Sequence, residues 1–208
     1  MELTSGIAIA DPWERLRGLR EDWFEVYDGM TVESDNRLRA LEIAITVWLS
    51  SSVAGTKAWN IWERREELAQ QLREIPAELD LSEVNVEDLP RVAADIQNAI
   101  RAIYVDDVAL SLATKILHKK RPLLIPIFDS RVSDHYFPKT SIRDKEVQLS
   151  RFPEMLRRFH LDLLQARSEL SDLRQRMLAA NCDISVVRVL EYLVWDHYDQ
   201  VAALRAAN

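Results

Sequence analysis

The sequence predicts a compact all-α protein, and three observations support that prediction. Apolar side chains recur at three- and four-residue spacing along most of the chain, which is the pattern of helices that bury one face. Gly occurs only four times in 208 residues, and positions 56–208 contain none. No pair of segments alternates apolar and polar residues in the manner of a β-hairpin. We expect about eight to ten helices in a single domain over residues 1–208, with an irregular lobe boundary near 76–90.

The N-terminal third contains three expected helices. Asp11 is followed by Pro12, a cap and a first-turn proline, so one helix begins there. A second is expected over residues 35–52, where an apolar stripe ends at three consecutive serines. A third is expected over residues 56–75, with Trp59 and Trp62 on its inner face and a charged outer face.

The remaining helices are expected over residues 90–104, 107–119, 130–136, 150–178 with a break near 171, and 185–204. Asp106 or Asp107 would cap the second of these, and Phe137-Pro138 would end the third. Residues 113–117 combine small and large apolar side chains, which permits close helix contacts. We therefore expect this segment to be central, buried beneath the 35–52 and 185–204 helices.

The composition excludes several classes of site. Phosphate-cradling loops, dinucleotide-binding fingerprints and nucleophile elbows all need Gly, so none is expected after Gly55. The single Cys182 excludes an internal disulfide, an iron–sulfur cluster and a cysteine zinc site. The four histidines lack the i, i+4 spacing of a helical zinc site. We predict no metal and no cofactor.

Charge and hydropathy limit the partners and the compartment. The net charge of −7 disfavours nonspecific binding to a polyanion, although a local basic patch could still bind one. The apolar stretches are shorter than the roughly 20 residues that a membrane span needs, and no basic leader region is visible. We therefore expect a cytoplasmic protein with no membrane partner.

Residues 115–131 differ in charge from the rest of the chain, with five Lys or Arg and one Asp. One interpretation is a solvated helix C-terminus, where cations suit the negative end of the helix dipole. The other is an anion- or phosphate-binding patch, which would bind nucleic acid or a phosphate-bearing ligand. The contacts of that patch would be Lys115, His118, Lys119, Lys120, Arg121 and Arg131.

Asp129 lies at the end of this segment and has three candidate roles. It precedes Ser130-Arg131-Val132, so it can serve as an ordinary N-cap of the helix that follows. It can form an ion pair with Lys115 or Arg131. It can also be a catalytic carboxylate.

A family resemblance rests mainly on this region. Three motifs of an uncharacterised, largely actinobacterial family read Ala-Ser-Lys-Leu-Leu, Lys-Arg-Pro and Pro-Val-Tyr-Asp-Ser. They resemble Ala113-Thr114-Lys115-Ile116-Leu117, Lys119 or Lys120 through Arg121-Pro122, and Pro126-Ile127-Phe128-Asp129-Ser130. The closing helix of the family resembles Arg188-Val189-Leu190-Glu191 near Trp195, with Glu in place of Asp. The similarity extends over about 170 residues and implies a bacterial protein, but it implies no activity.

A more distant similarity is to helix–hairpin–helix DNA glycosylases of the endonuclease III type. Those enzymes have a helix containing Thr-Ala, then an apolar connector and then Val-Asp-Thr-His. Their Asp lies sixteen residues after that Ala, and Asp129 likewise lies sixteen residues after Ala113. The resemblance implies a two-lobed scaffold in which Asp129 stabilises developing charge at the sugar, or activates the nucleophile, during base excision. The hairpin glycines, however, would fall on Asp107 and Ala109, and the lyase lysine on Ser111.

Two classes of function follow from the sequence. The first is a non-catalytic binding or interaction protein that acts through protein contacts, of which a homodimer is one form. The second is a nucleic-acid-directed enzyme with base-excision-like chemistry at Asp129. Acidity and the missing hairpin glycines favour the first class, whereas the basic segment and the position of Asp129 favour the second.

Overall fold

The protein is all-α, as predicted. The computed structural model describes residues 1–4, 6–19, 23–49, 53, 55–105, 108–137 and 145–206. Within them the chain forms eleven α-helices and two 3-10 helices, which is more than expected, and no strand beyond one bridge between Glu2 and Ala8. None of these helices combines the length and apolarity that crossing a bilayer requires.

In chain order the helices are α1 (Pro12–Leu19), α2 (Trp23–Gly29), α3 (Ala40–Ile45), η1 (Thr46–Leu49), α4 (Gly55–Glu63), α5 (Arg65–Arg73), η2 (Leu81–Glu83), α6 (Leu89–Ile103), α7 (Leu110–Lys120), α8 (Ser130–Tyr136), α9 (Lys145–Gln165), α10 (Arg167–Ala179) and α11 (Val186–Ala206).

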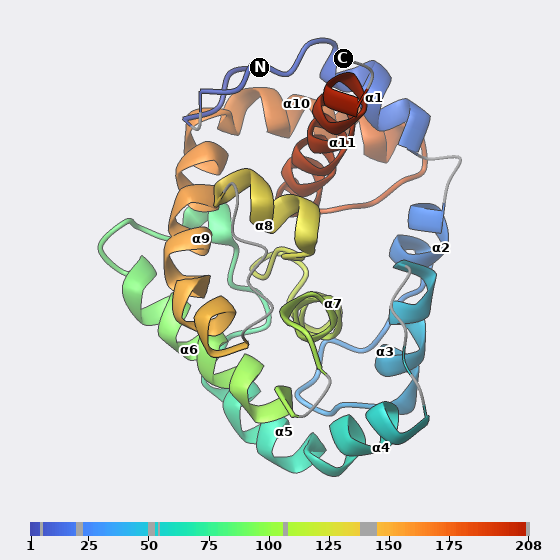
Figure 1. The fold of residues 1–208 in the computed structure, drawn as a ribbon, viewed down its shortest axis with the longest axis vertical. Coiled ribbons are helices and arrows are strands. Elements are labelled where there is room, and N and C mark those ends of the chain that lie inside the picture. Colours follow the sequence, from blue (N-terminus) through green and yellow to red (C-terminus); the bar gives the residue numbers. More distant parts are fainter. Residues whose placement is uncertain are drawn as a thin grey trace.

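Helix α7 is the centre of the fold. It is seen nearly end-on in the middle of Figure 1, with α5, α6 and α9 on one side, α2, α3 and α4 on the other, and α1, α10 and α11 above. Ala113, Ile116 and Leu117 on this helix are completely buried, which confirms the predicted central position. The helix packs against α6, α9, α3 and η1, whereas α11 packs mainly on α8, α1 and α10. Residues 185–204 were expected to cover α7, but other helices cover most of it.

Several helix boundaries differ from the prediction. The 56–75 helix is divided at Arg64, and the 150–178 helix is divided at Ala166. The 35–52 helix begins only at Ala40 and continues as a 3-10 turn from Thr46, whose hydroxyl donates to Ile43 O at 2.7 Å. A side chain that bonds the preceding turn in this way competes with regular helix geometry. Asp106 and Asp107, the expected caps of α7, lie outside the described residues.

Pro153 lies inside α9, although the sequence favoured a helix start there. A proline cannot donate to the carbonyl four residues earlier, so Leu149 O would lose its helical partner. The Gln97 side chain on α6 supplies a replacement, because its Nε2 donates to Leu149 O at 2.6 Å. A contact with another helix thus allows α9 to continue through the proline. The single-domain organisation stays a prediction.

Candidate functional site

Four of the six residues of the predicted basic patch are buried, namely Lys115, His118, Lys120 and Arg121, whereas Lys119 and Arg131 are partly exposed. Lys120 is fully buried and Arg121 is 1% exposed. Lys120 Nζ donates to Glu42 Oε1 at 2.8 Å, to Asp35 Oδ1 at 3.0 Å and to Glu33 O at 2.7 Å. A charge in this position is neutralised by carboxylates of the protein itself. The interpretation of this helix end as solvated is therefore wrong for Lys120 and Arg121.

Arg121 joins two segments that precede it in the chain. Its guanidinium donates to Leu72 O at 2.7 Å and to Ile75 O at 2.8 Å, at the C-terminal end of α5. It also donates to Ser34 O at 3.2 Å and to the Asn36 side chain. The last carbonyls of a helix have no partner within that helix. Arg121 supplies one here, so its positive charge stabilises the fold.

Lys115 and Lys119 also contact backbone carbonyls. Lys115 Nζ donates to Leu49 O at 2.7 Å, and Lys119 Nζ donates to Met30 O at 3.0 Å and to Tyr27 O. Burial lowers the pKa of both lysines, that of Lys119 to about 8. The structure thus places these α7 cations together, with their contacts directed into the protein.

Asp129 is the N-cap of α8, as one of its predicted roles requires. Its Oδ1 accepts the backbone N–H groups of Arg131 and Val132, each at 3.0 Å. Its Oδ2 accepts Nε1–H of Trp195 on α11 at 3.0 Å. Arg131 lies over the Trp195 ring, 4.0 Å from its centroid, and pairs with Asp199 at 2.7 Å. Both oxygens of Asp129 are therefore engaged in joining α8 to α11.

Sequence reasoning missed a buried charged group centred on Arg188, which is 1% exposed. Arg188 Nε donates to Asp28 Oδ1 at 3.0 Å, and Nη2 donates to the Tyr192 hydroxyl at 2.9 Å. Nη1 donates to Glu191 Oε1, and the Tyr192 hydroxyl donates to Asp28. Charged residues are seldom this buried unless they are paired, and every one of these groups has a partner.

Glu191 connects this group to the segment before α8. Its Oε2 accepts the backbone N–H of Ile127 at 2.9 Å. Burial raises the pKa of Glu191 to about 8, against the opposing effects of Arg188 and of the Ile127 N–H. Asp28 and Glu191 both contact the Arg188 guanidinium, and burial opposes the loss of the proton from the Glu191 carboxyl group.

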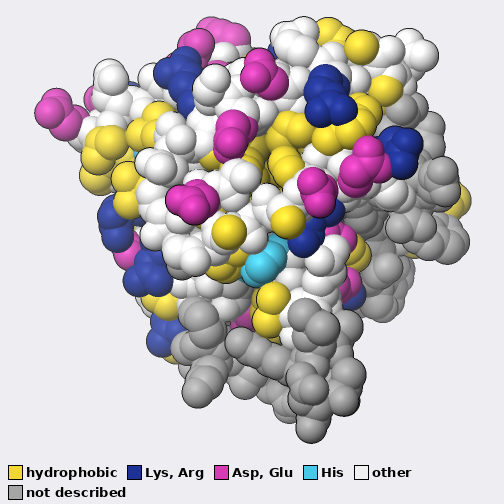
Figure 2. All heavy atoms as spheres, turned by 90° about the horizontal axis from the view of Figure 1, so that it is seen from above, with side chains coloured by type: hydrophobic (Ala, Val, Ile, Leu, Met, Phe, Trp, Pro, Cys, Tyr) yellow, Lys and Arg dark blue, Asp and Glu magenta, His cyan; other side chains and the backbone are white. Residues whose placement is uncertain are grey.

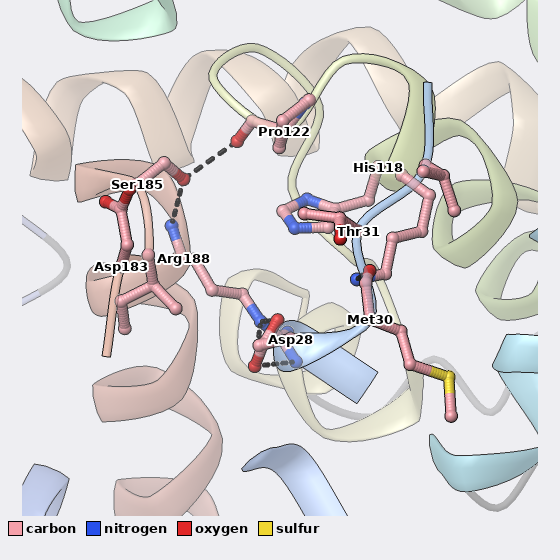
Figure 3. Close-up of a pocket in the computed structure, with 11 residues that line it drawn as sticks. Asp28, Met30, Thr31, His118, Pro122, Asp183, Ser185 and Arg188 are labelled. Carbon is pink, nitrogen blue, oxygen red and sulfur yellow. Dashed lines mark hydrogen bonds and ion pairs between the residues drawn. The ribbon is translucent and has the colours of Figure 1, made fainter. Parts of the chain in front are cut away.

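A cavity of about 180 Å³ lies beside Arg188 (Figure 3). Three segments that are distant in sequence form its walls: the end of α2, the end of α7 and the start of α11. Ser185 lies just before α11; its Oγ donates to Pro122 O at 2.8 Å and accepts the Arg188 N–H at 3.1 Å. The lining residues are Asp28, Met30, Thr31, Val32, His118, Lys119, Pro122, Asp183, Ile184, Ser185 and Arg188.

His118 presents an unprotonated nitrogen to this cavity. The residue is 3% exposed, and its Nδ1 lies 2.7 Å from Ile125 O. A carbonyl only accepts hydrogen bonds, so Nδ1 carries the proton and Nε2 carries the lone pair. Burial, reinforced by Arg188, lowers the pKa of His118 to about 3, so the ring is neutral at physiological pH. The described part of the chain gives Nε2 no hydrogen-bond partner, and the ring points toward Ser185 and Arg188 in Figure 3.

One signal in the sequence pointed to part of this site. Arg188 and Glu191 stand three residues apart in the otherwise apolar stretch 186–195, a spacing at which side chains meet. Two charges on a buried face need partners, so a buried polar group could have been expected. Asp28 and His118 could not have been assigned to it, because only the tertiary fold brings α2 and α7 to this end of α11.

The surface gives no support to a large basic face at the top of the molecule. Figure 2 shows acidic and basic side chains interspersed there among the described residues, with no continuous cover of Lys and Arg. No group of three or more His, Cys, Asp or Glu among the described residues has a metal-binding arrangement.

Comparison with known proteins places the chain in a family without assigning an activity. No curated protein and no solved structure matches it, so the similarity to helix–hairpin–helix glycosylases stays a prediction. A family model described as a family of unknown function, DUF6308, matches residues 14–198. Because this match extends over most of the chain, the protein belongs to the DUF6308 family.

Proposed function

We propose that this protein is a non-catalytic binding protein whose ligand is a small polar molecule held in the Arg188 cavity. The observation that carries the proposal is His118 Nε2, an acceptor on a side chain that is 3% exposed and lines the cavity, with no partner among the described residues. A ligand that donates to this nitrogen forms a hydrogen bond, which contributes a net free energy of about 0.5–1.5 kcal/mol.

The size of the cavity is suited to such a ligand. A cavity of roughly 150 Å³ in another protein binds benzene, and this one measures about 180 Å³. Its lining differs in carrying two carboxylates, a guanidinium, an ammonium and an imidazole beside apolar side chains. These groups favour a ligand of similar size that makes several hydrogen bonds.

The state of these groups favours binding over catalysis. A general base works best with a pKa near the operating pH, whereas the pKa of His118 is lowered to about 3. Asp28 is held by Arg188 and Tyr192, and Lys119 by two carbonyl oxygens. No group in the cavity is thus both free and suited to proton transfer near neutral pH.

The alternative function is a nucleic-acid-directed enzyme that uses Asp129. Affinity for nucleic acid comes largely from cations that contact phosphates, so those cations must be accessible. Lys115, Lys120 and Arg121 are buried and directed into the protein, and Asp129 is engaged by α8 and Trp195. The geometry therefore favours the binding protein. A gel shift that weakens with rising salt would favour the alternative.

The test of the proposed function is a thermal-shift screen against small polar compounds, comparing three proteins. A ligand that binds only the folded state raises the melting temperature. Thr31→Phe introduces a bulky side chain at the wall of the cavity, and Thr56→Phe makes the same change on exposed α4. We expect one or more compounds to stabilise the wild type and Thr56→Phe, but not Thr31→Phe. A screen in which nothing stabilises the wild type, or in which all three proteins respond equally, contradicts the proposal.

A further inference from the structure

The cavity contains one cation that contacts no carboxylate in the described structure. Lys119 Nζ contacts the carbonyl oxygens of Tyr27 and Met30, and it lies 4.2 Å from the centroid of the Tyr27 ring. Arg188, in contrast, is paired with Asp28 and Glu191. Lys119 is half-buried, and partial burial of an ammonium without a contacting counter-ion costs free energy, because the protein interior solvates charge poorly. A negatively charged ligand group would supply the missing counter-ion.

The opposite wall also favours negative charge. Ser185 precedes α11, a helix of 21 residues, so the first turn of that helix borders the cavity. The N-terminal end of a helix carries a partial positive charge and free N–H groups. Lys119 at the end of α7 and the start of α11 therefore form two positive sides of the same small space.

His118 adds a different requirement. Its Nε2 accepts a hydrogen bond, so it disfavours a bare anion and favours a donor group such as a hydroxyl. His118 and Lys119 are consecutive residues at the same end of α7, and both line the cavity. One ligand can satisfy both only if it carries an anionic group and a hydrogen-bond donor close together.

The acidic residues at the cavity do not oppose this arrangement. Asp28 is neutralised by Arg188, and the Tyr192 hydroxyl donates to it. Asp183 lies at the rim, where its side chain is 73% exposed and pairs with Arg174 at 3.3 Å. The charge that remains without a contacting partner inside the cavity is therefore that of Lys119.

We infer that the ligand is a small hydroxycarboxylate. Its carboxylate contacts Lys119 and the start of α11, and its hydroxyl donates to His118 Nε2. The inference rests on the proposed binding function and assigns the chemical class of the ligand. Lactate is a suitable probe, because it carries both groups and is no larger than benzene.

Four probes of similar size separate the contributions of the hydroxyl and of the carboxylate to the binding affinity. They are lactate, propionate without the hydroxyl, glycerol without the charge, and ethanolamine with the opposite charge. Binding is measured by isothermal titration calorimetry on the full chain at pH 7. We expect lactate to bind more tightly than propionate by about tenfold, which is the effect of one hydrogen bond of about 1.4 kcal/mol. Glycerol and ethanolamine should bind more weakly than either carboxylate.

Variants of the residues that line the cavity test whether lactate binds there. Lys119→Met should weaken lactate binding by tenfold or more, whereas Lys57→Met on α4 should leave it unchanged. Lys119→Arg, which retains the charge, should keep part of the affinity. Thr31→Phe should abolish binding without touching Lys119, so it tests the site even if Lys119→Met does not fold.

A pH series supplies a readout that depends on Lys119 itself. Burial lowers the pKa of Lys119 to about 8, with Asp28 opposing this effect and Arg188 reinforcing it. A bound carboxylate stabilises the ammonium, so binding takes up a proton as the pH rises above 8. The affinity for lactate should therefore fall between pH 7 and pH 9, and Lys119→Arg should not show this fall.

The outcomes distinguish the two proposals. Binding of glycerol or ethanolamine at the cavity, with none of lactate, overturns the hydroxycarboxylate and leaves the binding function standing. Lactate binding that Lys119→Met and Thr31→Phe do not change overturns the assignment of the site. If no probe binds and the broader screen also finds no ligand, both proposals fail.

Discussion

Arg188, in the first turn of α11, and Asp28, at the end of α2, form a buried ion pair across 160 residues of chain, with Nε 3.0 Å from Oδ1. The pair connects the N-terminal segment to the closing helix. It also forms one wall of the cavity, because both residues line it. The same contact therefore supports the fold and the candidate site.

Removal of Asp28 should destabilise the protein strongly. Asp28→Ala leaves Arg188 buried with Glu191 as its remaining acidic contact, and breaking a buried pair in this way costs about 3–5 kcal/mol. Urea denaturation measures the loss. Glu14→Ala, which removes an exposed i, i+3 pair with Arg17, is the control and should cost less than about 1 kcal/mol. Similar losses in the two variants would show that the buried pair does not stabilise the fold.

Lys120 offers a second test of buried charge. Lys120→Met removes the cation that lies 2.8 Å from Glu42, which is itself fully buried, so we expect a loss of about 3–5 kcal/mol. Arg64→Met breaks an exposed pair with Glu67 and should change the free energy of unfolding by less than about 1 kcal/mol. If Lys120→Met unfolds at the wild-type urea concentration, the contribution of the ion pair is refuted.

Asp129 should behave as a cap with a second partner. Asp129→Ala removes both acceptors and should cost about 0.5–2 kcal/mol from the cap alone. Asp129→Asn can keep the cap through its carbonyl, but its amide then faces Trp195 Nε1–H, so it should cost about 1 kcal/mol.

The additional cost of Asp129→Asn is attributable to Trp195. In the background of Trp195→Phe, which has no N–H, the Asn substitution should be nearly neutral. A double-mutant cycle by urea denaturation measures this coupling. Full additivity of the two substitutions would contradict the assigned contact.

Acidification should destabilise the protein below pH 6.5. Burial lowers the pKa of His118 to about 3 and that of His135 to about 4, from an ordinary value of 6.5. Between pH 6.5 and pH 4 the unfolded chain therefore binds protons that the folded chain does not. Each histidine contributes a loss of about 1.4 kcal/mol per pH unit in this range. Urea denaturation at pH 7, 6 and 5 measures the slope.

Glu191 changes the stability of the protein with pH in the direction opposite to the histidines. Burial raises its pKa from 4.5 to about 8, so between these values the folded chain keeps a proton that the unfolded chain loses. Its contribution to stability is complete below pH 4.5 and decreases as the pH rises to 8. Glu191→Gln removes this effect: the acid loss below pH 6.5 should become steeper, and the decline from pH 6.5 to pH 8 should disappear. Unchanged pH curves in Glu191→Gln would contradict the raised pKa.

Local sequence determined the helices. The interval from Leu89 to Ile103 and that from Ser130 to Tyr136 follow from apolar periodicity and caps, which depend on neighbours within one or two turns. Local sequence likewise predicted that Asp129 caps α8. The predicted boundaries were wrong where a contact with another helix decides them. Pro153 is an example, because Gln97 on α6 supplies the contact that lets α9 continue.

Only the tertiary structure decided what the charges do. The sequence showed that residues 115–131 are basic. It did not show that Lys120 and Arg121 would be buried and would donate hydrogen bonds to carbonyls and carboxylates of residues 33–42 and of the end of α5. Asp28, His118 and Arg188 are far apart in sequence, and each alone is unremarkable. The pairing of a charge depends on which segments the packed core brings together, and that is a property of the whole chain rather than of any local pattern.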